Sequence, residues 1–472
     1  MLTWLTKWWR EFASGFWLMP AALLLAGILL SVVASELDRE FDDYMPERLR
    51  TSAATGRATL GALAGAMITV TGVVFSTTTV ALSITSTQLG PRLLRNFLEQ
   101  QVTQVTLGVC LGTSAYCLIL LRRVDRFEDE MLVPHGAILL ASVLGVVTLM
   151  MIVYFIHRVT HSLQANNVAS DVADDLDAAV QRLFPTAPGE SGSDAAAAAD
   201  APAEGGWREA WIQFDEDDVQ LVRAIEEGYV QAIDESALFA AARGADVALR
   251  VRSRPGDFLR KDDPLVDARP AGRLEGAALQ RVQKAFLVGN LRTPQQDVEC
   301  AVNELVEIAV RALSPGVNDP FTAIVCVDRL SGALCRLALR RPPSGLRTDD
   351  SGRLRLVARP RCFADALNAA MDPLRQHARG NLAVTARVMH ALRAIATRCR
   401  RRSDRLLVKR QADRILSAAD KSGLAEEDVR EIEAIHADVV RALAVDQPWL
   451  DGHPPRTNAT STRNSIRSTP DV

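Results

Sequence analysis

The stretch ATLGALAGAMITVTGVVFSTTTVALSITSTQLGPR, residues 58–92, contains no Asp, Glu, Lys or Arg before its final arginine. An uncharged, mostly apolar run of more than about 18 residues is typical of a helix that crosses a membrane. Gly90 and Pro91 mark its end, because proline is favoured in the first turn of a new helix. We therefore predict a membrane span at about 58–84.

Three further stretches, residues 12–35, 100–121 and 131–157, also lack Asp, Glu, Lys and Arg. Each is long enough to cross the hydrocarbon core of a bilayer. Together they predict a transmembrane domain over residues 1–160, with four spans at about 16–34, 58–84, 102–121 and 136–156. Four spans exclude a soluble enzyme and a protein held by a single anchor.

Small residues recur at every third or fourth position of the second predicted span, so they share one face of a helix. They are Gly61, Gly65, Thr69, Gly72, Ser76, Thr79, Ser83 and Ser86. Two interpretations fit this face. Small residues let membrane helices pack closely; alternatively, the hydroxyl-rich end lines water in a pore while the glycine end packs.

No Asp, Glu, Lys or Arg lies inside any predicted span. Ion-coupled transporters usually carry ionisable groups near the middle of the membrane, so the sequence favours a passive pore or a packed bundle. Beyond the second span we expect Arg92 and Arg95 to contact lipid headgroups. Acidic residues after the first span could draw cations to a pore mouth or form an ordinary solvated loop. They are Glu36, Asp38, Glu40, Asp42 and Asp43.

The orientation of the spans is indicated by two opposing signals. Lys and Arg beside the spans lean slightly toward an external N-terminus. The cysteines argue the other way, because an odd set follows the spans and exported domains more often carry paired cysteines. This set is Cys300, Cys326, Cys335, Cys362 and Cys399. We expect both termini in the cytoplasm.

The chain after residue 160 is predicted to divide into four parts. Residues 161–206 form a polar helix and an Ala/Pro/Gly/Ser-rich linker, and residues 207–268 form a small β-rich α+β subdomain. Residues 269–450 are predicted to be helical, and residues 451–472 to be a disordered tail. The predicted fold class is mainly α: a four-helix transmembrane region, a cytoplasmic α+β subdomain and a helical C-terminal region.

The sequence SPGVNDPFTA, residues 314–323, is the most motif-like element of this soluble part. A tight turn that delivers Asn318 and Asp319 to a helix N-terminus could bind an anion or polar ligand. The other interpretation, which the sequence favours, is a rigid connector in which Asp319 caps the next helix.

Motifs for catalysis or for a metal site are not found. His157 and His161 lie four residues apart, but no third ligand is identifiable. The formal net charge of −3 gives no reason to expect nucleic acid as a partner. We therefore expect no enzyme activity, cofactor or metal, and a lipid bilayer as the main partner.

Several stretches resemble one protein family. They are FSTTTVALSITSTQLGPRLLR (75–95), FIHRVTHSLQ (155–164), RPGDF (254–258), RTPQQD (292–297) and ALSPGVNDPFTA (312–323). Over about residues 10–440 the chain looks like bacterial predicted membrane proteins of the domain of unknown function 2254 family. The resemblance implies a bacterial inner-membrane protein with an N-terminal multi-span region. It implies no established activity.

The leading hypothesis from the sequence is a homo-oligomeric passive pore with a cytoplasmic regulatory domain. In this hypothesis the second span lines the pore. The alternative is a membrane-anchored scaffold or sensor, whose four spans are only a packed bundle.

Overall fold

A computed structural model describes residues 17–41, 51–88, 101–127, 134–162, 164–184, 210 and 218–444. These residues fall into two compact units. One unit holds the chain up to Asp171 together with the short piece Ser314–Asn318, and the other holds the remainder.

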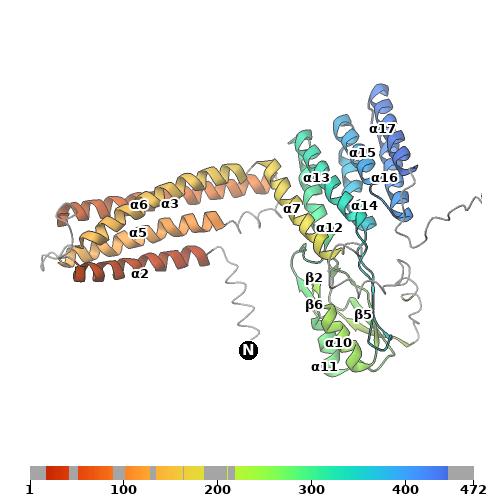
Figure 1. Cartoon of the computed structure of the whole chain (residues 1–472), viewed down its shortest axis with the longest axis horizontal. Coiled ribbons are helices and arrows are strands. Elements are labelled where there is room, and N and C mark those ends of the chain that lie inside the picture. The colour runs from red at the N-terminus through yellow and green to blue at the C-terminus, as the bar shows by residue number, and fades with distance from the viewer. Residues whose placement is uncertain are drawn as a thin grey trace, which may run out of the picture. The chain divides into compact units, whose positions relative to one another are not determined.

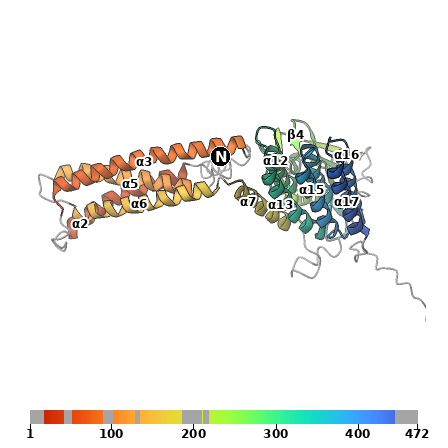
Figure 2. The ribbon, with the colours of Figure 1, turned by 90° about the horizontal axis from the view of Figure 1, so that it is seen from above.

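Four long helices make up most of the first unit and lie side by side (Figures 1 and 2). They are α2 (Leu18–Phe41), α3 (Ala53–Gln88), α5 (Gln101–Phe127) and α6 (His135–Ser162). All four are long and apolar enough to cross a membrane, over Leu18–Asp38, Ala53–Ile84, Val102–Val124 and His135–His161. The expectation of four apolar helices is confirmed.

Helix α5 is the central helix of this bundle, and α2, α3 and α6 all pack against it. About 56% of its apolar span is buried, against 22–28% for the other three. Tyr116 and Leu120 of α5 are fully buried together with Leu60 of α3. A hydroxyl contact of 3.0 Å joins Thr113 of α5 to Thr148 of α6. The bundle therefore has its core along α5.

The closest helix contact in the bundle lies between α2 and α5. An ideal Cβ placed on Gly27 would collide with the backbone carbonyl of Gly112, and one placed on Gly108 would collide with the Leu23 side chain. Gly108 and Gly112 are four residues apart, the spacing with which small residues bring two membrane helices together. Glycine is required here because the two backbones touch.

Polar contacts tie the four helices together at one end of the bundle. Arg123 of α5 forms an ion pair of 3.0 Å with Glu36 of α2. Asp38 of α2 accepts a 2.7 Å hydrogen bond from the backbone N–H of Ala137 in the first turn of α6. His135 accepts another, of 3.0 Å, from the N–H of Thr51 just before α3. Glu36 and Asp38 therefore lie in α2 and hold helices together, whereas Glu40, Asp42 and Asp43 have no described side chains.

The second unit contains two β-sheets. The larger has the strand order β1 (Gln220–Arg223), β5 (Pro264–Arg269), β3 (Ala248–Val251), β8 (Leu354–Ala358) and β7 (Leu346–Thr348). The smaller has the order β4 (Phe258–Leu259), β2 (Gly228–Ile233) and β6 (Phe286–Gly289). Strand β3 pairs with β8 in parallel, although about a hundred residues separate them in the sequence.

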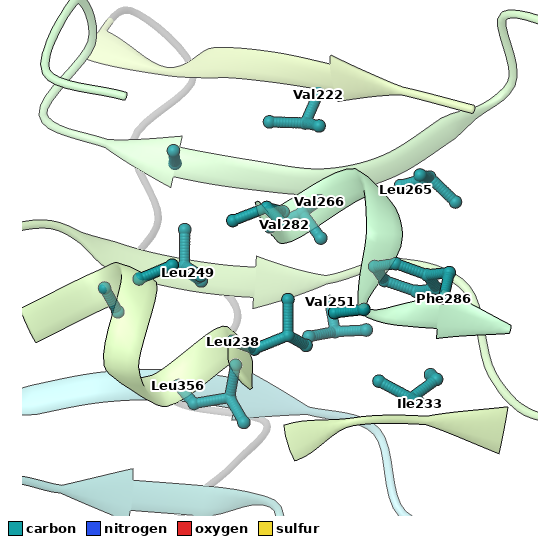
Figure 3. Close-up of a cluster of buried hydrophobic side chains, with 14 of the residues drawn as sticks. Val222, Ile233, Leu238, Leu249, Val251, Leu265, Val266, Val282, Phe286 and Leu356 are labelled. Atoms are coloured by element: carbon teal, nitrogen blue, oxygen red, sulfur yellow. The ribbon is translucent and has the colours of Figure 1, made fainter. Parts of the chain in front are cut away.

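One face of the larger sheet carries the hydrophobic core, which is shown in Figure 3. Leu249 and Val251 alternate with Arg250 along β3, so the two apolar side chains share a face. They pack with Leu238 of α10 (Glu235–Ala245) and Val282 of α11 (Gly276–Lys284). Asp234 caps α10 by accepting a hydrogen bond from the N–H of Ala237.

Helices form the rest of the second unit, and neighbours in this region pack against one another. They are α12 (Val298–Ala312), α13 (Pro320–Leu339), α14 (Phe363–His377), α15 (Leu382–Ala396), α16 (Arg402–Asp420) and α17 (Glu426–Ala444). Helix α7 (Ala165–Leu183) runs across the boundary between the two units, which falls after Asp171. The strands β6, β7 and β8 also lie between residues 269 and 450, where the sequence indicates helices alone. Residues 211–217 and 445–472 lie outside the described part of the chain.

The contact between α2 and α5 leads to a stability prediction. Gly27→Ala should lower the free energy of unfolding by about 1–3 kcal/mol, because the new methyl group overpacks a backbone contact. Gly244→Ala, in helix α10, is the control, since a Cβ there meets no described atom within 4 Å. Unfolding titrations in mixed detergent micelles measure both variants. Equal stability of Gly27→Ala and the unaltered protein would contradict this packing.

Candidate functional site on the outward face of α3

The small-residue face of α3 points away from the bundle. Its described members are all exposed: Gly61, Gly65, Thr69, Gly72, Ser76, Thr79 and Ser83. The opposite face of the helix, with Leu60, Met67 and Val74, is buried. An ideal Cβ on Gly61, Gly65 or Gly72 meets no atom of the described chain within 4 Å. Within one described chain, no other helix approaches these glycines closely.

The outward surface of α3 differs in chemistry from that of its neighbours. Helices α2 and α6 expose large apolar side chains, as expected for contact with lipid tails. Among these are Leu25, Leu29 and Val33 of α2 and Val146, Met150 and Val153 of α6. On α3 the exposed small face continues toward the N-terminus through Ala58 and Ala54, with larger residues such as Ile68 and Val80 beside it.

The threonine hydroxyls on this face are bonded to their own helix. The Thr69 hydroxyl donates to the carbonyl oxygen of Gly65 at 3.0 Å, and the Thr79 hydroxyl donates to that of Phe75 at 3.0 Å. Each threonine hydroxyl already donates its proton within the helix, but its oxygen still has lone pairs that can accept a hydrogen bond or contact a cation. The face is a neutral row of hydrogen-bond acceptors, which can replace part of the hydration of a cation without holding it tightly.

The remaining predicted residues near this helix are only partly covered by the structure. Ser86 lies within α3, but its side chain is outside the described residues, and so are Arg92 and Arg95. Their predicted roles at the pore and at the headgroups stay predictions.

The turn at Asn318 and Asp319 forms the start of α13. One oxygen of Asp319 accepts hydrogen bonds of 3.1 Å from the N–H groups of Phe321 and Thr322, and the other accepts one of 2.6 Å from the Thr322 hydroxyl. The Thr322 hydroxyl and these N–H groups lower the pKa of Asp319. Asn318 has a φ of 47°, in the left-handed region. The Asp319 carboxylate is thus occupied by its own helix, as in the connector interpretation.

A buried charge network, which residue spacing does not reveal, joins the RPGD and RTPQQD motifs. Arg292 donates to the buried carboxylate of Asp297 through Nε at 2.8 Å. Gly256 of RPGD lies so close that a Cβ on it would collide with Asp297. Arg361, just before α14, pairs with Glu299 and donates to the carbonyl oxygen of Pro255 at 2.6 Å. The network connects the turn after β3 to the starts of α12 and α14.

Asp297 lies at the start of α12 as its N-cap residue and makes no side-chain capping bond. Its Oδ2 accepts from Arg292, whereas its buried Oδ1 has no hydrogen-bond partner in the described chain. Nearby, burial is the largest influence that lowers the pKa of Arg254, with the positive charge of Arg361 next.

Arg254 forms an ion pair with Asp365, Arg292 with Asp297, and Arg361 with Glu299. Three buried atoms of the network, Arg254 Nη1, Asp297 Oδ1 and Arg361 Nε, have no hydrogen-bond partner in the described chain. Because the ion pairs join separate segments of the chain, we assign the network to folding of this unit.

The thiols and histidines of the described residues do not form a reactive or metal-binding centre. Burial raises the pKa of Cys326 and of Cys399 to about 12, which makes both thiols unreactive at neutral pH. The rings of His157 and His161 are 6.3 Å apart, and Nδ1 of His161 lies 2.9 Å from the amide nitrogen of Asn167. Among the described residues, no group of three or more His, Cys, Asp or Glu side chains is placed so that it could hold a metal ion.

Comparison with known proteins supports the membrane assignment. The family described as "Predicted membrane protein (DUF2254)" matches residues 13–394. An uncharacterized protein of Mycobacterium tuberculosis strain H37Rv is 28% identical over 453 residues, which cover 93% of this chain and 82% of that protein. An uncharacterized protein of Mycobacterium bovis matches to the same extent. No solved structure matches this chain. The chain belongs to the DUF2254 family of predicted membrane proteins.

Proposed function

We propose that copies of this protein assemble in the membrane around their α3 helices and form a passive pore. The observation that carries the proposal is the exposed row of small and hydroxyl-bearing residues along α3. Large apolar side chains such as Val73 and Phe75 are exposed beside this row, as they are on α2 and α6. Burying the row itself against lipid tails gains little, whereas burying it against another α3 allows close packing.

The two halves of the α3 face have different roles in this proposal. Gly61 and Gly65 allow close helix packing between copies, while Ser76, Thr79 and Ser83 line water near the symmetry axis. Because no ionisable side chain lies on this face, flux is passive and uncoupled. Helix α3 has 36 residues and extends for about 54 Å at 1.5 Å per residue. It is longer than the hydrocarbon core of about 30 Å, so one end reaches beyond the core.

In this proposal the role of the second unit is to regulate the pore.

One observation favours a second candidate, a membrane-anchored scaffold or sensor without transport. The threonine hydroxyls on the α3 face are already bonded to their own helix. A back-bonded hydroxyl is tolerated in a lipid environment, so the face needs no partner and no water. In that case the four helices serve only to hold the second unit at the membrane.

Cysteine substitution along α3 separates the two candidates. Each position from Ser76 to Ser83 is changed to cysteine in reconstituted protein, and a thiol reagent is added during a conductance measurement. Block should be strongest at Ser76, Thr79 and Ser83, because these lie on one helix face. Val147→Cys is the control, since Val147 of α6 is exposed among the large apolar side chains. If no conductance is seen, or if block shows no helical period, the scaffold candidate replaces the pore.

We further propose that the protein lies in a bacterial inner membrane with both termini in the cytoplasm. The native thiols after the spans are mostly buried, so a topology test needs an added cysteine. Asp350, in the turn between β7 and β8, has a side chain that is 92% exposed. An impermeant thiol reagent should label Asp350→Cys only after the cells are lysed. Labelling of intact cells would place the second unit outside.

A further inference from the structure

Helices α14, α15 and α16 line a small recess in the second unit. The three helices pack against one another and lie side by side in Figure 1. Arg375 of α14 and Arg379, just after that helix, line the recess together with Thr385 of α15 and Ser422, just after α16. About 10 Å³ is open to the centre of a water-sized group, which is about the least that one such group needs. A larger ligand can therefore place only one atom of this size in the recess.

One of the side chains that line the recess has a buried donor without a partner. The Nε of Arg375 is buried and donates to no atom of the described chain. Asp372 satisfies this arginine only weakly: its Oδ1 lies 3.7 Å from Nη2 of Arg375, while Arg414 donates to the same oxygen at 2.8 Å. An unsatisfied buried donor on a charged group is costly. The recess therefore lacks one hydrogen-bond acceptor.

The charge of the lining indicates what kind of acceptor fits. The residues that line the recess include two arginines and no acidic residue. The two hydroxyls donate their protons within the chain, Thr385 to the carbonyl oxygen of Ala378 at 3.1 Å and Ser422 to that of Ala419 at 2.6 Å. The side-chain donors that remain belong to the two guanidinium groups. These bind an anionic oxygen about twice as strongly as a neutral one.

We propose that this recess binds a phosphate-class oxyanion, with one oxygen in the recess beside Arg375 and the other oxygens at its mouth beside Arg379. Guanidinium groups match the oxygens of a phosphate, because their N–H groups form a rigid planar fork. Free phosphate and the terminal phosphate of a larger ligand share this chemistry. The site lies wholly within the second unit, so it does not depend on whether α3 forms a pore.

Isothermal titration calorimetry on the full chain in a maltoside detergent tests the ligand class. Inorganic phosphate and methyl phosphate are titrated separately, with sodium chloride holding the ionic strength constant. We expect saturable binding of at least one of them. Tighter binding of methyl phosphate would support the terminal phosphate of a larger ligand, and tighter binding of inorganic phosphate would support the free ion. No saturable binding of either would mean that only water fills the recess, which would overturn the proposal.

Three variants test whether the anion binds in the recess. Arg375→Gln should weaken binding by about tenfold or more, because a hydrogen bond to a charged group is lost. Arg379→Gln should weaken it by about two- to fivefold, since Arg379 is exposed. It decides the outcome if circular dichroism shows that Arg375→Gln is unfolded. Arg430→Gln is the control, because the Arg430 side chain is 71% exposed on α17. Unchanged affinity for Arg379→Gln together with a folded Arg375→Gln of unchanged affinity would contradict the proposal, as would an equal loss for Arg430→Gln.

Discussion

The contact between the backbones of Gly27 and Gly112 sets the arrangement of the membrane-spanning unit. Lipid tails are as apolar as leucine, so membrane helices gain little from burying apolar side chains and depend on close packing. At this contact α2 and α5 touch without intervening side chains. Helix α5 becomes the centre, and α3 and α6 pack on its remaining sides. The face of α3 that points away from the bundle carries the small and hydroxyl-bearing residues.

A comparable constraint operates in the second unit, but there it is electrostatic. The RPGD turn, the RTPQQD segment and Arg361 come from three separate places in the chain and meet in one buried network. Removing one partner of a buried ion pair leaves an uncompensated charge, which is far more costly than losing a surface pair. The network fixes the sheet turn against the starts of α12 and α14, and so joins the α+β region to the helices.

The sequence predicts the four spans correctly because apolar runs of this length without a charge are rare outside membrane helices. It does not show which glycine pair makes the close contact. Gly61 and Gly65 have the same spacing as Gly108 and Gly112, yet only the second pair packs within the described chain. That difference depends on which face of each helix meets α5, a property of the tertiary fold.

Two other features of the fold cannot be predicted from the sequence, for similar physical reasons. Strand β6, with the sequence FLVG, is a short apolar run that periodicity cannot distinguish from part of a helix. The charge network depends on segments that are distant in the chain, and spacing between residues carries no signal of their meeting. By contrast, Asp319 caps α13 as predicted, because capping is a local interaction.

The proposed pore requires that α3 meets α3 of another copy, and disulfide crosslinking in the bilayer tests this contact. Thr69→Cys places a thiol on the outward face of α3, and Val147→Cys places one on the large apolar surface of α6. Under mild oxidation in lipid vesicles, we expect covalent dimers for Thr69→Cys and monomers for Val147→Cys. Monomers for both variants, together with a single-chain mass for the protein in nanodiscs, would contradict the assembly around α3.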